Sequence, residues 1–219
     1  LPFSRRHLGL AMLSGVCFAG DLATWNTGAL MTTAANATFL GNTSTLWVAL
    51  GALVLFRQKL RRPFWGGLLL TLAGASLIVL QDYLKNPTVG AGSLLSLTAG
   101  VFYGAYFLTT QRAREGLTAL TTWWISALTC MVTLLLLSLM TGQPLTGYSW
   151  QTYAIIFALA LTTQVIGYVA VSYALGHVPA SIASPSMLTQ PVVTMLLAVP
   201  ILGQPKSERE DAQFRADRV

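Results

Sequence analysis

Long stretches without a charged residue dominate this sequence. Asp, Glu, Lys and Arg are all absent between Asp21 and Arg57, between Lys85 and Arg112, and between Glu115 and Lys206. An α-helix needs roughly 20 apolar residues to cross about 30 Å of hydrocarbon, and each stretch is long enough for at least one crossing. The sequence therefore predicts a series of transmembrane helices rather than a water-soluble domain.

Composition supports this interpretation. Only 9% of the 219 residues are charged and 54% are hydrophobic, whereas a soluble domain carries about 25% charged residues. The net charge of +6 does not indicate nucleic-acid binding, because the basic residues lie at the ends of apolar stretches and do not gather on one surface. Cys17 and Cys130 fall inside apolar stretches, so we expect packing residues and neither a disulfide nor a metal site.

The apolar residues group into seven spans, which predicts an all-α, polytopic integral membrane protein. The spans cover roughly residues 8–28, 33–56, 64–82, 90–110, 119–141, 151–175 and 181–202. Turn signals such as Asn86-Pro87 and Gly142-Gln143-Pro144 separate them. Gly100 and Gly104, four residues apart in the fourth span, are expected to permit close helix packing.

Basic residues predict the orientation of the spans. If the loops alternate between the two sides, one side collects eight basic residues before the polar tail and the other collects only Lys85. The eight are Arg5, Arg6, Arg57, Lys59, Arg61, Arg62, Arg112 and Arg114. Because Lys and Arg favour cytoplasmic loops, we expect that side to face the cytoplasm.

A weak internal repeat relates the second and seventh spans. Residues 34–58 align with 180–204 at an offset of 146, with identities that include Thr43/Thr189. The two spans are five helices apart, so alternating topology makes them antiparallel. Inverted repeats of this kind occur in many secondary transporters.

The same stretches resemble EamA-type permeases of the drug/metabolite transporter superfamily. The first copy reads TAANATFLGNTSTLWVALGALVLFRQKLRRPFWGGLLLTLAGASLIVL from Thr33, and the second contains HVPASIASPSMLTQPVVTMLLAVPILGQP. That family places a Pro about a dozen residues before a Leu-Gly-Glu turn. Pro191 fits this pattern, whereas Gln204 replaces the Glu, and Gln58 and Thr45 depart from the pattern in the first copy.

The resemblance implies a fold of ten helices in two inverted halves of five, with the first two helices and the last one missing from this chain. Residues 1–85 would then form three helices of the first repeat, and residues 86–205 four of the five helices of the second. The polar segment 206–219 would be a disordered or out-of-frame tail.

Asp21 is the only acidic residue in the interior of a predicted span. A carboxylate at membrane depth is costly and should face a cavity or a partner, so Asp21 is a candidate for proton coupling or for binding a substrate amine. The alternative is an acid near the outer end of its helix that water reaches. Trp25 lies one turn further along the same face.

Other candidate substrate-binding residues form polar or aromatic stripes at helical spacing, and packing between helices is an equally good explanation for them. They are Thr38, Asn42 and Thr45 in the second span, Tyr103 and Phe107 in the fourth, and Gln164 and Tyr168 in the sixth. Pro191 in the seventh span is a further candidate, because proline frees backbone carbonyls in a membrane helix.

These observations predict a secondary permease that moves a small metabolite, such as an amino acid or a drug-like compound, by alternating access. We expect it in the bacterial inner membrane, with the lipid bilayer and a small-molecule substrate as partners and without cofactor, metal or nucleic acid. Enzymatic motifs such as H-E-x-x-H or G-x-S-x-G do not occur. Two alternatives remain: an inactive truncated remnant, and a seven-helix receptor, although no lysine lies mid-membrane to hold retinal.

Overall fold

The computed structural model describes residues 4–32, 34–57, 62–143 and 145–186, and every regular element within these ranges is a helix. This confirms the all-α class. Five segments of the described chain are long and apolar enough to cross a membrane: Arg5–Met31, Asn36–Phe56, Val89–Arg114, Ala119–Thr141 and Trp150–Ala174. The chain divides after Ser184, and the arrangement below concerns the unit that ends there.

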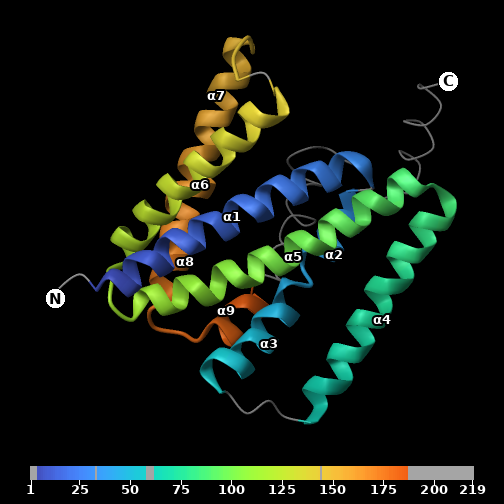
Figure 1. Ribbon diagram of the computed structural model, residues 1–219, viewed down its shortest axis with the longest axis horizontal. Coiled ribbons are helices and arrows are strands. Elements are labelled where there is room, and N and C mark those ends of the chain that lie inside the picture. The colour runs from blue at the N-terminus through green and yellow to red at the C-terminus, as the bar shows by residue number, and fades with distance from the viewer. Residues whose placement is uncertain (1–3, 33, 58–61, 144, 187–219) are drawn as a thin grey trace, which may run out of the picture. The chain divides into compact units, whose positions relative to one another are not determined.

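Helix α5 (Pro87–Arg114) lies at the centre of the described helices, with α1 (Arg5–Met31) antiparallel beside it (Figure 1). Small residues bring the two helices close together. A Cβ atom added to Gly28 of α1 would lie 2.5 Å from Ser96 Oγ and 2.7 Å from the Gly92 carbonyl oxygen of α5. Such close backbone approach is how membrane helices pack in the absence of a hydrophobic driving force.

The second predicted span is not one continuous helix. It consists of α2 (Ala34–Gly41) and α3 (Ser44–Phe56), interrupted at Asn42 and Thr43. The Thr43 hydroxyl donates a hydrogen bond of 2.6 Å to the Leu40 carbonyl, which offers the backbone an alternative to the regular helical ladder. The span predicted over 33–56 is present as Asn36–Phe56, with this interruption inside it.

The interruption packs against the two glycines of α5. A Cβ atom at Gly100 would lie 2.6 Å from Thr43 Oγ1, and one at Gly104 would lie 2.8 Å from the Cβ of Trp47. Gly100 and Gly104 therefore permit the close helix packing that their spacing predicts, with the α2–α3 break as the partner.

Helix α4 (Arg62–Lys85) contains the third predicted span and is joined to α5 by Asn86. The two helices touch near this turn, where Gly90 lies against Tyr83, and α4 diverges from α5 beyond it (Figure 1). The apolar side chains of α4 that the structure describes, such as Leu70, are largely exposed, as expected for residues that face lipid. The predicted boundary between the two repeats, at 85/86, falls at this turn.

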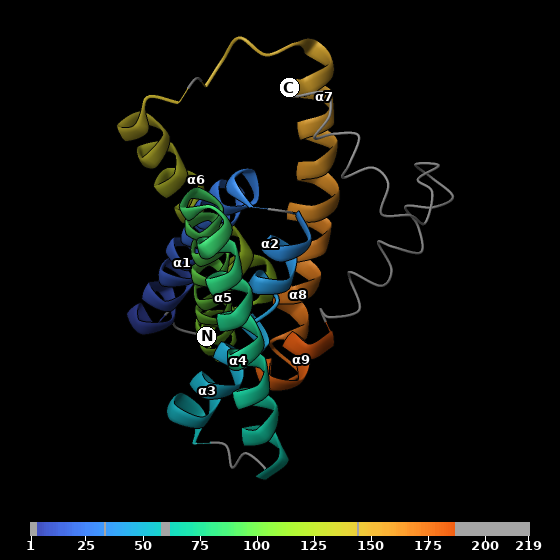
Figure 2. The same ribbon diagram turned by 90° about the vertical axis from the view of Figure 1, so that its right-hand side faces the viewer.

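Helix α6 (Ala119–Thr141) matches the fifth predicted span at both ends. The sixth span runs as α7 (Trp150–Leu159), η1 (Ala160–Gly167) and α8 (Tyr168–Ala174), and η1 has π-helical hydrogen bonding. Figure 2 shows α8 close to α6, while α7 and the other end of α6 diverge. The seventh span begins with α9 (Ala180–Ser186); the rest of it, Pro191 and segment 206–219 lie outside the described residues.

Several helix ends meet where the basic residues gather, which we call the basic end of the bundle. There, Gly116 lies against His7 at the start of α1, Arg112 contacts Leu55 near the end of α3, and Gln111 contacts Ala180 at the start of α9. These contacts agree with alternating up and down spans. That the basic end faces the cytoplasm stays a prediction.

Candidate functional site

Asp21 lies in the interior of α1, well away from the basic end, and is half-buried. Among the residues that the structure describes, the one ion pair joins Arg112 and Glu115, with 2.9 Å between Nη1 and Oε1. Asp21 therefore has no cationic partner in this part of the chain. A carboxylate in that setting is available to a proton or to a positively charged ligand.

Five aromatic side chains pack against one another and form what we call the aromatic cluster: Phe18, Tyr103, Tyr106, Phe107 and Tyr168. Their rings come from α1, α5 and the start of α8. Ring centroids lie 4.6 Å apart for Phe18 and Tyr168, 5.0 Å for Phe18 and Tyr106, and 5.0 Å for Tyr103 and Phe107. These separations and tilted geometries are those of favourable aromatic pairs.

The carboxylate of Asp21 belongs to the same group of side chains. It lies within electrostatic reach of Tyr103 and Tyr168, whose hydroxyls approach each other, and of Cys130 on α6. Four elements, α1, α5, α6 and α8, thus bring one carboxylate, two hydroxyls and several ring faces together. Ring faces and carboxylates both attract cations, so the arrangement suits a ligand with an amine and an apolar body.

The structure separates the predicted stripe of the second span. Thr38 is exposed on α2, Asn42 is half-buried at the break, and the Thr45 hydroxyl donates to the Ser184 carbonyl of α9 at 3.5 Å. Because the helix is interrupted, the three do not continue as one helical face. None of them lies in the aromatic cluster.

Trp25 and Gln164 also lie outside the cluster. The Trp25 ring packs beside Gly41, where an added Cβ atom would be 3.2 Å away. Gln164 lies in η1, and its backbone carbonyl accepts a hydrogen bond of 2.9 Å from Nε1 of Trp123 on α6. That bond ties the π-helical stretch to α6, and such stretches are frequent at functional sites. Pro191 lies outside the described residues.

Sequence reasoning missed Phe18 and Tyr106, which complete the aromatic cluster, and three buried polar atoms outside the cluster. Trp47 Nε1, Thr110 Oγ1 and Ser184 Oγ have no hydrogen-bond partner among the described residues. The Thr110 hydroxyl approaches that of Tyr106, but without regular hydrogen-bond geometry. An apolar helix gives little sign of which ring or hydroxyl faces its neighbours, so only periodicity could have suggested these residues.

Comparison with known proteins gives one match. The sequence model described as the EamA-like transporter family matches residues 90–208, which is more than half of the chain and runs from α5 through α9. The division of the chain into two repeats, with the second at 86–205, stays a prediction. No curated protein and no solved structure gives a significant match to the chain.

Proposed function

The chain belongs to the EamA-like transporter family, and from this premise we propose that it is a secondary transporter of a small amphipathic metabolite that works by alternating access. The family makes it a membrane transporter of the drug/metabolite type, embedded in a lipid bilayer by its apolar helices. Its substrate and mechanism are the subject of the proposal.

The observation that carries the proposal is the position of Asp21 beside the aromatic cluster. The carboxylate supplies one negative charge, and the basic side chains whose surroundings the structure describes lie at the basic end of the bundle. An anionic substrate would be repelled there, whereas an amine could meet Asp21 while its apolar part stacks on Phe18 or the tyrosine rings. Amino acids and cationic drug-like compounds are the substrate classes that fit best.

A proton could occupy Asp21 in place of an amine, which would make this residue a coupling site. The two roles differ in binding. If Asp21 holds the amine, its neutralisation weakens substrate binding even when no gradient is present. If Asp21 only carries the coupling proton, binding persists and gradient-driven accumulation is lost. In both cases the aromatic cluster contacts the apolar part of the substrate.

The test is transport by the full chain in membrane vesicles, with a labelled aromatic amino acid and a labelled organic cation as probes. We expect Asp21→Asn to lower transport of the accepted probe about tenfold or more, since losing one partner of a buried charge pair costs about 2–5 kcal/mol. Asp82→Asn, which removes the same charge from α4, is the matched control. Equal transport by wild type and Asp21→Asn would refute the assigned site.

The same experiment also tests the hypothesis that the chain is an inactive remnant. Vesicles that contain well-folded wild-type chain but accumulate neither probe, nor a wider panel of amines, would favour an inserted but inactive protein. Folding is checked first, by a sharp thermal unfolding transition of the purified chain in detergent.

A further inference from the structure

We propose that Gln111, Arg112 and Arg114 form a latch that closes the transport path at the basic end, and that the path runs between α3, α5 and α9 past Thr110 and Ser184. This inference rests on the proposed transport function, because it names the gate through which the site at Asp21 would open.

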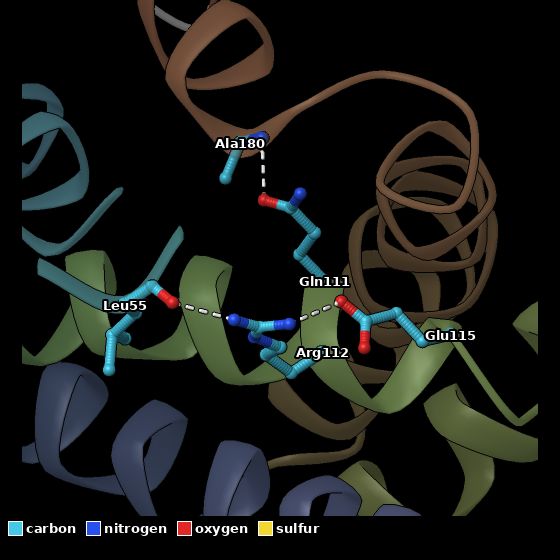
Figure 3. Close-up of polar contacts among 5 residues, drawn as sticks. All are labelled: Leu55, Gln111, Arg112, Glu115 and Ala180. Atoms are coloured by element: carbon cyan, nitrogen blue, oxygen red, sulfur yellow. Dashed lines mark hydrogen bonds and ion pairs between the residues drawn. The ribbon is translucent and has the colours of Figure 1, made fainter. Parts of the chain in front are cut away.

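The latch consists of side chains from the last turn of α5 that hold other helices by their ends (Figure 3). Gln111 Oε1 accepts a hydrogen bond of 2.9 Å from the Ala180 backbone N–H, at the first residue of α9. Arg112 Nη2 donates one of 2.6 Å to the Leu55 carbonyl near the end of α3. Both partners are backbone groups that the ends of helices leave unpaired.

Arg112 and Arg114 make further contacts between the end of α5 and its neighbours. The Arg112 guanidinium carbon lies 4.1 Å from the centroid of the Phe56 ring, and its Nη1 pairs with Glu115. Arg114 Nε donates 2.8 Å to the Ser172 carbonyl in α8, while Nη1 donates to the Leu117 carbonyl. The end of α5 thus holds α3, α8 and α9 through polar groups that are exposed or half-buried. Water can replace each such bond, so the contacts can break and form again at small net cost.

Two buried hydroxyls without a hydrogen-bond partner among the described residues, those of Thr110 and Ser184, lie one turn inside the latch. Thr110, one turn before Arg114, is 1% exposed, and Ser184, one turn after Ala180, is 3% exposed. Trp47 Nε1, also without a partner there, lies deeper along α5, beside Gly104. Buried polar groups are nearly always paired, and each exception calls for an explanation. Entry of water or of substrate hydroxyl and amine groups between α3, α5 and α9 would supply the missing partners.

One stripe of α5 connects this region to the proposed substrate site. Tyr103, Phe107, Thr110 and Arg114 follow each other at spacings of four, three and four residues and therefore share a face. Tyr103 belongs to the group around Asp21, Phe107 is completely buried, and Arg114 belongs to the latch. The path assigned here is closed along this stripe first by the Phe107 ring and then by the latch.

The experiment measures access from the basic end without needing a substrate. In a chain that carries Cys17→Ala, Cys130→Ala and Thr110→Cys, the new thiol is labelled with a membrane-impermeant maleimide in inside-out vesicles. Adding Gln111→Ala and Arg112→Ala removes two interhelical hydrogen bonds. Each bond in a membrane protein shifts an equilibrium about threefold on average, so we expect about eightfold faster labelling.

Arg5→Ala, which removes a basic side chain at the start of α1, is the matched control and should leave the labelling rate unchanged. An unchanged rate in the double variant, or equal acceleration by the control, would overturn the latch. Because the double variant could also loosen the fold, a second experiment locks the same contact in place. In a chain without other cysteines, Gln111→Cys and Ala180→Cys are joined with a short, thiol-cleavable cross-linker, which should stop transport until reductant restores it.

The two proposals fail separately. Faster labelling without transport of any probe supports the latch and contradicts the transport function, whereas normal transport after cross-linking contradicts the latch alone.

Discussion

Phe18 and Tyr168 face each other with ring centroids 4.6 Å apart and ring planes at 57°, although one belongs to the first helix and the other to the sixth predicted span. Tyr168 is also the first residue after the π-helical stretch η1, so the irregular hydrogen bonding of η1 ends where the aromatic cluster begins. A change in η1 would therefore move a ring of the cluster directly.

The hydroxyl of Tyr168 is expected to matter for binding more than for folding. Tyr168→Phe keeps the ring against Phe18 but removes the hydroxyl that approaches Tyr103 and lies near Asp21. An interhelical polar contact of this kind contributes about 0.6 kcal/mol on average in membrane proteins, so we expect about threefold weaker binding with little change in the unfolding temperature. Equilibrium binding of the accepted probe measures it.

Tyr153→Phe is the matched control for that variant, because Tyr153 lies on α7 with 40% of its surface exposed. It should bind the probe as wild type does. If both variants bind equally well, the Tyr103–Tyr168 pair is a packing contact and takes no part in recognition.

The contact between α1 and α5 predicts a large effect at one glycine and none at another. Gly28→Val places carbon atoms where Ser96 Oγ and the Gly92 carbonyl already lie, at 2.5 and 2.7 Å from the first added atom. The helices must separate, which we expect to cost about 1–3 kcal/mol of unfolding free energy. Gly9→Ala, on the same helix with nothing within 4 Å, should be neutral or stabilising by up to about 1 kcal/mol.

Thermal or denaturant unfolding of the two variants in the same detergent measures this difference. A Gly28→Val protein as stable as Gly9→Ala would show that α1 and α5 do not pack as closely as described.

Sequence reasoning located best those helices whose start and stop signals lie at their own ends. Helix α6 begins and ends as predicted because the Thr118 side chain accepts a hydrogen bond from the Thr121 backbone N–H at its start, and Gly142 takes a left-handed conformation at its end. The α2–α3 break and η1 were missed because their partners lie far along the chain. Gly100 contacts the break and Trp123 bonds η1.

The candidate site also combines residues that the local sequence identifies with contacts that depend on distant segments. Asp21 was identifiable because a lone acid at membrane depth is rare, and Tyr103 and Tyr168 stood out as polar residues at helical spacing. Their mutual proximity could not be predicted, since it depends on how far each helix slides past the next, and glycine contacts such as Gly28 with Gly92 set that register. Arg112 and Arg114 were interpreted only as orienting charges, because their helix-end partners are backbone groups without a sequence pattern.

Gly176 offers an independent route to the latch. A Cβ atom there would lie 2.6 Å from the Arg114 guanidinium carbon and 2.7 Å from its Nε. The guanidinium is the end of a flexible side chain, so Gly176→Ala should displace it from the Ser172 carbonyl at a stability cost below about 1 kcal/mol. We expect faster maleimide labelling of the Thr110→Cys chain. Gly74→Ala, with nothing within 4 Å of the added atom, should not change the rate; acceleration by both would point to general loosening.

The bond between Trp123 and Gln164 yields the last prediction. Trp123→Phe keeps an aromatic ring but removes the indole N–H that donates to the Gln164 carbonyl in η1. Without that bond we expect η1 to relax toward regular helix, which would rotate Tyr168 away from Phe18. Hydrogen exchange at residues 164–168 should change about threefold or more for a bond of this strength, and probe binding should weaken.

Trp124→Phe is the control, because Trp124 is adjacent, 52% exposed and in contact with the Trp123 ring. It alters the same tryptophan pair without touching the bond to η1. If Trp123→Phe and Trp124→Phe give the same exchange pattern, the indole–carbonyl bond does not hold η1, and the irregular hydrogen bonding must arise from the sequence of η1 itself.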